Sequence, residues 1–154
     1  MLTVSDGVAG GTRDDASGRA LVAQLTESGY DVLDQRVCSD GIETVAAALR
    51  ELTDGFAGLV VTTGGTGFGP RDLTPEGTLA VIEREAPGIA EAVRRASDSD
   101  GRGFGMLSRG RAGTRGQALI CNLPGSASGA REGLGVLLPI VRHALDLLAG
   151  GHPH

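Results

Sequence analysis

The sequence predicts an α/β protein, a three-layer sandwich around a mostly parallel sheet. Apolar runs typical of strands alternate with stretches of helical periodicity, and glycines end several of the periodic stretches. This alternation implies right-handed crossovers between parallel strands, with helices on both faces of the sheet. A ligand would then lie at the carboxyl ends of the strands.

The first half of the chain contains three expected strands and two expected helices. In order, they are a strand at residues 2–5, a helix that follows a polar loop (6–18) and ends at Gly29, a strand at 30–37, a helix from Ile42 to near Gly55, and a strand at 58–63. The last strand, "GLVVTT", is a continuous apolar run, which is the pattern of a strand covered on both faces.

The second half continues the alternation with less regular segments. Thr74 is expected to cap a helix whose first turn holds Pro75, where the missing N–H costs nothing. The other expected elements are a helix break at 86–88, a helix at 89–96, an arginine- and glycine-rich loop at 97–116, a buried strand within 117–126, and a closing helix at 133–150. Pro139 is expected to kink that helix or to mark its start.

The length of 154 residues fits one domain, expected over residues 1–150 with a tail at 151–154. No apolar run approaches the ~20 residues of a membrane-spanning helix, and the first residues lack the pattern of a signal peptide, so the expected location is the cytoplasm, with no membrane partner. A net charge of −5 and 3% aromatic residues argue against nucleic-acid binding. An anionic ligand must therefore be held by local geometry.

Missing residue types exclude several chemistries. All 14 basic residues are arginine, which excludes a Schiff-base lysine, a pyridoxal-phosphate lysine and a phosphate-loop lysine. The histidines, His143, His152 and His154, lie in the last dozen residues, which argues against a multi-histidine zinc centre; His143 is expected on a helix at the edge of the core. Cys38 and Cys121 lack metal-binding spacing, and Cys121 is expected to be a buried structural thiol.

The stretch "VTTGGTGFGPRDLTPEGT" (61–78) is the most informative part of the sequence. Gly64 and Gly69 have the spacing of a Walker A loop, but Pro70 and Arg71 replace its lysine and hydroxyl residue, and Pro70 also replaces the last glycine of the dinucleotide pattern. Consecutive glycines at a strand's carboxyl end can still direct several amides at one oxyanion. A purely structural tight turn is the alternative, but four glycines in six positions favour ligand binding.

Two aspartates are expected near this glycine loop. Asp72 follows it directly, and Asp40, in "VCSDG", follows another strand and precedes a helix. In a parallel sheet both would reach the same edge, although Asp72 alone could be a surface capping residue. Two carboxylates beside a phosphate site, without lysine or histidine, form a set of hard oxygen ligands suited to magnesium.

Two further segments complete the predicted edge. Ser108 and Arg109 lie in one of them, and Pro124, Gly125 and Ser126 lie in the other. Arg109 could bind a phosphate or carboxylate with its forked donors, and Ser126 could cap the last helix or donate to a ligand. A surface arginine and a plain helix cap are the corresponding alternatives.

These segments together resemble the MoaB/Mog-like molybdopterin-binding family, whose members include molybdopterin adenylyltransferases. The likeness covers nearly the whole chain and rests, in order, on "LTVSDG", "DDASG", "CSDG", "TTGGTGFGPRDLTPEGT", "LSRG", "LICNLPGS" and "LLPIVRHALDLL". It implies a three-layer α/β fold, a homotrimer, and binding of molybdopterin, a pterin dithiolene phosphate. In the adenylyltransferase members, Mg²⁺-ATP transfers AMP to the terminal phosphate of molybdopterin and releases pyrophosphate; a molybdenum-insertion protein is the implied partner.

The resemblance also implies roles for individual residues. Asp40 and Asp72 would be the catalytic carboxylates and would hold Mg²⁺. The substrate-binding residues would be Ser5, Asp6, Gly64, Gly65, Thr66, Gly67, Ser108, Pro124, Gly125 and Ser126. Two departures from the family pattern are a short first strand and a more polar, glycine-rich segment at 96–110, where ligand contacts are expected to differ.

Two other functional interpretations stay open. A non-catalytic pterin-binding or scaffold trimer would keep the same fold, but the presence of both Asp40 and Asp72 favours an enzyme. Hydrolysis of nucleotide derivatives, another use of this fold, would require additional domains that 154 residues do not accommodate.

Overall fold

The computed structural model of the protein describes residues 1–97 and 101–151, and in this part of the chain the strands form a six-stranded sheet of order β2-β1-β3-β6-β5-β4. The strands are β1 (Leu2–Val4), β2 (Arg36–Cys38), β3 (Gly58–Thr63), β4 (Arg84–Glu85), β5 (Ala112–Arg115) and β6 (Ala118–Leu123). Strands β2, β1, β3 and β6 are parallel, whereas β5 pairs antiparallel with β6, and β4 pairs antiparallel with β5. The predicted α/β fold with a mostly parallel sheet is confirmed.

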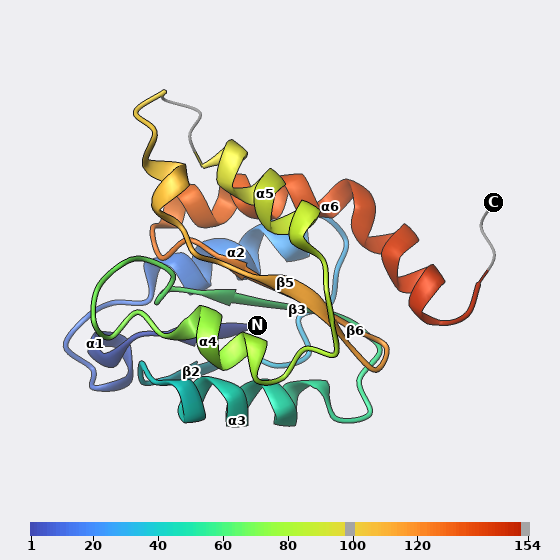
Figure 1. The fold of residues 1–154 in the computed structure, drawn as a ribbon, viewed down its shortest axis with the longest axis horizontal. Helices are drawn as coiled ribbons and strands as arrows, with labels where there is room; N and C mark the ends of the chain where they lie inside the picture. The colour runs from blue at the N-terminus through green and yellow to red at the C-terminus, as the bar shows by residue number, and fades with distance from the viewer. Residues whose placement is uncertain (98–100, 152–154) are drawn as a thin grey trace.

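Helices cover both faces of this sheet (Figure 1). They are α1 (Asp6–Ala9), α2 (Ala16–Glu27), α3 (Ile42–Thr53), α4 (Thr74–Leu79), α5 (Pro87–Ala96), the 3₁₀ helix η1 (Phe104–Leu107) and α6 (Ala127–Leu148). Helices α2, α5 and α6 share one apolar cluster, and α3 shares the other with β1. Helix α4 packs closely on α3, because a Cβ at Gly77 would lie 2.7 Å from the Cβ of Val45.

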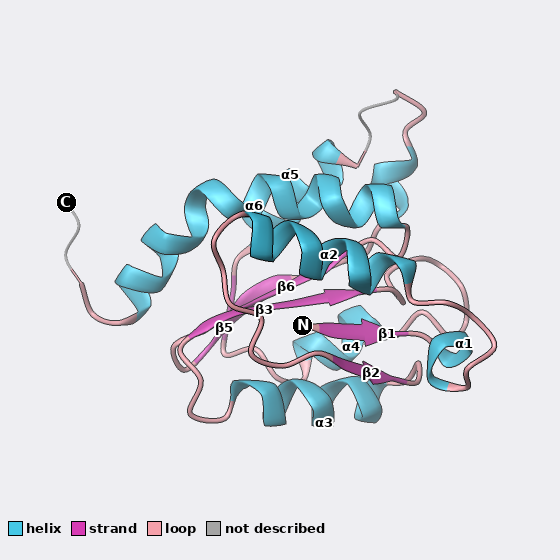
Figure 2. Cartoon of the chain, turned by 180° about the vertical axis from the view of Figure 1, so that it is seen from behind, coloured by secondary structure: helices cyan, strands magenta, loops and turns pink. Residues whose placement is uncertain are grey.

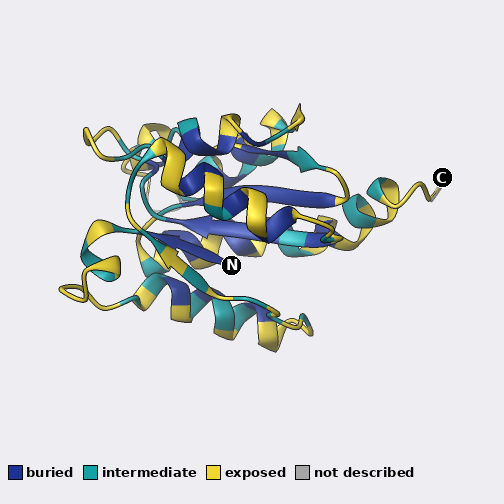
Figure 3. Ribbon diagram, turned by 90° about the horizontal axis from the view of Figure 1, so that it is seen from below, coloured by how far each residue is buried: buried dark blue, intermediate teal, exposed yellow. Residues whose placement is uncertain are grey.

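The central strands separate the two apolar clusters. In β3, Val60 faces the α3 side and Val61 faces the α2 and α6 side, and in β6 Ile120 and Cys121 divide in the same way. All six residues of β6 are buried. Figure 3 shows the corresponding pattern, with buried strands between helices whose outer sides are exposed. A strand covered on both faces is the arrangement that the continuous apolar runs predict.

Two element predictions in the first half need correction. Residues 6–9, expected as loop, form α1, whose N-cap Ser5 accepts a hydrogen bond from the Val8 N–H (3.3 Å). The strand expected at 30–37 is limited to β2, because it pairs only with β1, which is itself three residues long.

The second half differs more from the prediction. The helix that begins at Thr74 ends at Leu79, and β4 comes before α5. Thr74 is not the cap: the N-cap position belongs to Leu73, because the Thr74 hydroxyl donates to the Gly64 carbonyl instead (2.9 Å). The expected loop at 97–116 contains η1 and β5.

The closing helix is longer than predicted. It begins six residues before the expected start at 133, and it continues through Pro139, beyond which Figure 1 shows the helix turning away from its first half. His143 lies on this helix but is exposed rather than at the core edge. Of the expected tail, His152 and His154 lie outside the described residues. No helix in the described part of the chain combines the length and hydropathy needed to cross a membrane.

Candidate functional site

The carboxyl ends of the four parallel strands meet at one edge of the sheet (Figure 2). Ser5, Gly64 and Pro124 directly follow β1, β3 and β6. The Thr63 hydroxyl donates to the Pro124 carbonyl (2.7 Å) and so ties two of these strand ends together. A cavity of about 750 Å³ opens at this edge.

Almost all of the residues predicted for the site line this cavity. They are Ser5, Asp40, Gly64, Gly65, Thr66, Gly67, Asp72, Ser108, Pro124, Gly125 and Ser126. Asp6 and Arg109, which was also expected at this edge, do not line it. The structure therefore brings together segments that are more than a hundred residues apart in the chain. This is expected at the carboxyl ends of the strands of a parallel α/β sheet, where ligands bind at the point at which the strand order reverses.

The loop after β3 requires glycine where it begins. Gly64 and Gly65 have φ values of +99° and +62°. A Cβ at Gly64 would lie 2.2 Å from the Val4 carbonyl oxygen, and one at Gly65 would lie 2.3 Å from the Thr74 hydroxyl oxygen. The Thr74 N–H also donates to the Gly65 carbonyl (3.1 Å). Close packing thus accounts for these two glycines, and their backbone still lies against the cavity.

Asp72 folds back into the same loop rather than capping α4. Its carboxylate accepts a hydrogen bond from the Gly69 N–H (2.8 Å), and its own N–H donates to the Gly69 carbonyl (3.0 Å). A Cβ at Gly67 would lie 2.9 Å from the Asp72 Oδ2 atom. The glycines therefore leave room for the carboxylate at the cavity wall.

Asp40 is held by reciprocal hydrogen bonds with Asp6. The Asp6 N–H donates to the Asp40 carboxylate (2.8 Å), and the Asp40 N–H donates to the Asp6 carboxylate (3.0 Å). Arg71 donates to both Asp6 carboxylate oxygens (3.0 and 3.1 Å) and to the Asp40 carbonyl (2.6 Å). The hydrogen bonds from Arg71 lower the pKa of Asp6 below its usual value. Asp6 therefore holds the Asp40 loop in place.

Two helices begin at the cavity. Ala16 and Ser17 from the first turn of α2, and Ala127, Ser128 and Gly129 from the first turn of α6, line it. Asp15 caps α2 through the Gly18 N–H (2.9 Å), and Ser126 caps α6 through the Gly129 N–H (3.2 Å). Helix N-termini favour anions because their first N–H groups lack intrahelical partners. Of the two roles considered for Ser126, the structure shows the cap.

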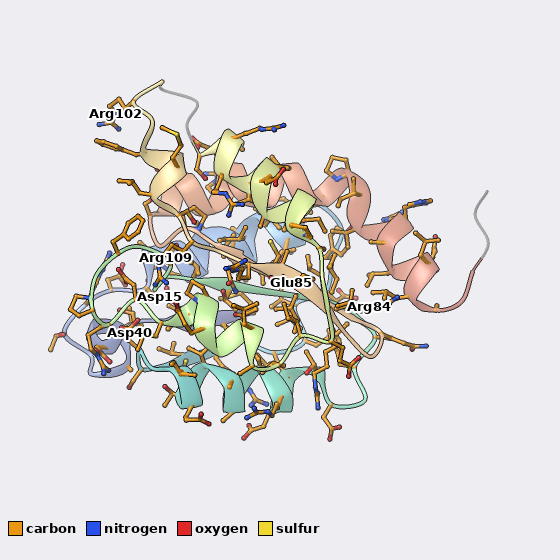
Figure 4. All side chains as sticks on the ribbon, in the orientation of Figure 1. Asp15, Asp40, Arg84, Glu85, Arg102 and Arg109 are labelled. Carbon is orange, nitrogen blue, oxygen red and sulfur yellow. The ribbon has the colours of Figure 1, made fainter. Side chains whose placement is uncertain are left out.

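Some cavity residues were not identified from the sequence. Arg13 and Glu132 line the wall near the two helix starts, and Arg102 and Phe104 line the wall formed by the segment before β5. Figure 4 shows Asp40 and Arg109 at the same end of the molecule, with Arg102 farther out on that segment. The glycine-rich loops around Arg13 and Arg102 were the only local indication that these residues could bind a ligand. No pattern in the sequence indicated that Glu132 lies at the site.

The two cysteines do not offer reactive thiolates. Burial, together with the charge of Asp40, raises the pKa of Cys38 to about 11, and burial raises the pKa of Cys121 to about 12. Both thiols are free, and Cys121 is fully buried, as expected. No group of three or more histidine, cysteine, aspartate or glutamate side chains able to hold a metal occurs in the described residues.

Comparisons with known proteins agree with the resemblance noted in the sequence. Residues 1–143 match the family described as "Probable molybdopterin binding domain". The chain is 35% identical to a molybdopterin adenylyltransferase of Helicobacter pylori, over 99% of this chain and 88% of that protein. It is also 38% identical to gephyrin of Dictyostelium discoideum, but there 96% of this chain spans only 22% of the relative.

A solved structure has the same fold. The crystal structure of the molybdopterin biosynthesis enzyme MoaB from Thermus thermophilus superposes with a TM-score of 0.87 at 41% identity, covering 97% of this chain and 94% of that one. The predicted relationship to molybdopterin adenylyltransferases is thereby confirmed at the level of family and fold.

Proposed function

Because the chain belongs to the probable molybdopterin binding domain family, we propose that it acts in molybdenum cofactor biosynthesis by transferring AMP from ATP to the terminal phosphate of molybdopterin. A bond would form between a pterin phosphate oxygen and the α-phosphorus of ATP, while the bond from that phosphorus to the bridging oxygen breaks and pyrophosphate leaves. The observation that carries the proposal is the 750 Å³ cavity, because glycine amides, two helix starts and two carboxylates line it together.

The cavity wall is suited to phosphates despite the acidic chain. The loop of Gly64, Gly65, Thr66 and Gly67 places backbone along one wall, and the starts of α2 and α6 place their first turns along another. Backbone N–H groups in such positions bind oxyanions without a lysine. Arg13 adds a cation at the cavity. We assign the phosphates to these walls.

Asp40 and Asp72 would hold the magnesium ion that the family resemblance implies. Each carboxylate accepts one backbone N–H through its Oδ2 atom, and the Oδ1 atoms have no hydrogen-bond partner among the described residues. A pair of carboxylates fits magnesium, which usually keeps several waters and binds substrate phosphates alongside one or two protein ligands. When bound, the ion would neutralise charge that develops on the phosphates.

The protein itself would contribute mainly positioning. Phosphoryl and nucleotidyl transfer need little covalent chemistry from the protein, so alignment of the two phosphates is the main task. Ser5, Pro124 and Gly125 line the same cavity and would contact the pterin or the nucleotide. Ser108, on the wall near η1, offers a hydroxyl to the same ligands.

Assembly and downstream transfer extend this proposal. We propose a homotrimer that delivers its product to a molybdenum-insertion protein, following the family resemblance. The exposed apolar residues Phe104, Met106 and Leu107 of η1 give one surface on which other chains could pack. Sedimentation of the purified protein at three times the chain mass of 15.6 kDa would support the trimer, and a monomer would contradict it.

The proposed reaction is tested by product analysis. The purified protein is incubated with molybdopterin, Mg²⁺ and ATP labelled at the α-phosphate, and the pterin is then identified by mass spectrometry. Label on the pterin together with released pyrophosphate is the expected result, and neither should form when the pterin is omitted. Tight pterin binding without labelled product would instead support a non-catalytic pterin-binding protein.

A further inference from the structure

Arg109 reaches across the molecule to the loop that carries Asp72. It lies between η1 and β5, more than thirty residues after Asp72 in the chain, yet it is not among the residues that line the cavity. Its main-chain N–H donates to the Thr66 carbonyl (2.8 Å). Its side chain is 30% exposed. The sequence alone suggested a ligand-binding arginine, but the position of this side chain indicates another role.

The guanidinium group of Arg109 donates to three separate acceptors in the glycine loop and α4. Its Nε–H donates to the Gly67 carbonyl (2.8 Å), and its two terminal nitrogens donate to the Asp72 carbonyl and to the Glu76 carboxylate. The ring of Phe68 lies 6.0 Å from the guanidinium carbon, at the limit of a cation–π contact. One planar group therefore fixes the chain before, within and after the turn that presents Asp72.

The three acceptors explain why this position needs arginine. A guanidinium group holds its donors in a rigid planar fork, whereas an ammonium group is a compact charge on a flexible stem. A lysine could pair with Glu76, but it could not also reach both carbonyl groups in the same geometry. Glu76 depends on this contact, because its second carboxylate oxygen is buried without a hydrogen-bond partner among the described residues. Loss of Arg109 would leave that carboxylate unpaired.

We infer that Arg109 is a positioning residue that sets the backbone of the Gly67–Asp72 turn, and through it the place of the Asp72 carboxylate in the cavity. The inference rests on the proposed function only for its effect on turnover. Its effect on the loop is a property of the protein without substrate. An error in carboxylate placement lowers the rate of transfer more than it lowers ligand affinity, because alignment matters most in the transition state.

The test compares Arg109→Gln with Arg109→Lys and with the control Arg111→Gln. Arg111 forms a similar pair with Glu85 (3.3 Å) but on the exposed edge of the sheet, away from the cavity. Two readouts are needed: amide hydrogen exchange of Gly69, Asp72 and Thr74, whose N–H groups are hydrogen-bonded within the loop, in the substrate-free protein, and kcat and KM for AMP transfer. Amides of β3 report whether the core stays folded.

We expect both Arg109 variants to raise exchange at the three loop amides at least about tenfold while β3 stays protected. We also expect kcat to fall at least about tenfold with KM changed less than about threefold. Arg111→Gln should leave both readouts within about twofold of the wild type. Restoration of the wild-type values by lysine would mean that charge alone matters, and would overturn the inference.

The outcomes separate the two proposals. Unchanged loop exchange in both Arg109 variants would overturn the positioning role, and so would faster exchange with wild-type kcat. If the wild type shows no AMP transfer, the proposed reaction fails, but hydrogen exchange still decides whether Arg109 holds the turn. If Arg109→Gln does not fold, Arg109→Lys provides both readouts, because it keeps a cation beside Glu76.

Discussion

The loop that carries Asp72 and the loop that carries Asp40 reach the same cavity but are held in different ways. The Asp72 loop is fixed by buried Thr74 and by Arg109, whose side chain is only 30% exposed. The Asp40 loop is fixed by Asp6 and Arg71, which are 49% and 61% exposed. Solvent screens exposed ion pairs strongly, and their contribution to stability is small. The Asp72 loop should therefore tolerate substitutions less well than the Asp40 loop.

Substitution of the first glycine in each loop should give the largest difference. Gly64→Ala would place a Cβ 2.2 Å from a backbone oxygen at a φ of +99°. Gly41→Ala would also be strained, at a φ of +150°, but its Cβ would meet only the movable Thr44 hydroxyl, at 2.8 Å. We expect Gly64→Ala to lower the free energy of unfolding by about 3 kcal/mol or more, and Gly41→Ala by about 1–2 kcal/mol. Urea denaturation measures both changes.

Gly55→Ala is the matched control for backbone strain. Its φ of +62° also favours glycine, but a Cβ there would meet nothing within 4 Å. It should cost about 1 kcal/mol from strain alone. Equal losses for Gly64→Ala and Gly55→Ala would show that the close approach of β1 to the Asp72 loop has no energetic effect.

Replacement of the arginine that holds each loop should give an intermediate difference. Arg71→Gln removes an exposed pair, and the reciprocal hydrogen bonds between Asp6 and Asp40 remain. We expect kcat for AMP transfer to fall less than about threefold, against the tenfold loss expected for Arg109→Gln. A larger loss for Arg71→Gln than for Arg109→Gln would reverse the comparison between the loops.

The pH dependence of stability should show a smaller effect confined to the Asp40 loop. The pKa of Asp6 is lowered by Arg71, so the pair contributes stability above the unfolded pKa of aspartate and loses it as pH falls through the lower folded pKa. Asp6→Asn should therefore be less stable than the wild type near neutral pH, and the difference should vanish in acid. Urea midpoints measured from about pH 2 to pH 7 provide this curve.

An Arg71→Gln background controls for the origin of the pH effect. If Arg71 causes the lowered pKa of Asp6, the loss of stability caused by Asp6→Asn must be smaller in the Arg71→Gln background than in the wild type, because the two positions then no longer interact. An unchanged loss in that background would assign the effect to another group.

The smallest expected effect of a substitution concerns the thiol that precedes the Asp40 loop. With a pKa of about 11 and partial burial, Cys38 should react with iodoacetamide near neutral pH far more slowly than it does in urea. Arg71→Gln should raise the labelling rate only slightly, because the Asp6 hydrogen bonds persist. Rapid labelling of the folded wild type would mean that the Asp40 loop opens frequently.

Much of the fold could be predicted because its signals are local. Continuous apolar runs predicted β3 and β6. Apolar residues three and four positions apart predicted α3, whose Val45 and Leu49 are fully buried. Strand β5 was missed because "AGTR" carries no apolar or β-branched pattern, and its place depends on pairing with β6. Helix α4 is shorter than predicted, because no local pattern in the sequence indicates the short strand β4 that follows it.

The site was predictable only as a set of positions. Parallel strands brought the expected loops to one edge, so the residues named from the sequence line the cavity, except Asp6 and Arg109. The roles of Asp6, Thr74 and Arg109 could not, because each depends on a hydrogen bond to a loop that is distant in the chain or in another element. Residue type shows that an arginine can donate to a phosphate, but only the fold shows that each guanidinium nitrogen of Arg109 already donates to Gly67, Asp72 or Glu76.

The most direct test of the central claim is AMP transfer by the wild type and by Asp72→Asn and Asp40→Asn, with molybdopterin binding measured on the same samples. Both variants should bind the pterin within about threefold of the wild type and lose at least about a thousandfold in pyrophosphate release, because the proposed carboxylates act on the transferring phosphates rather than on pterin affinity. Wild-type turnover in either variant would contradict the assignment of that aspartate, and wild-type turnover in both would contradict the proposed site.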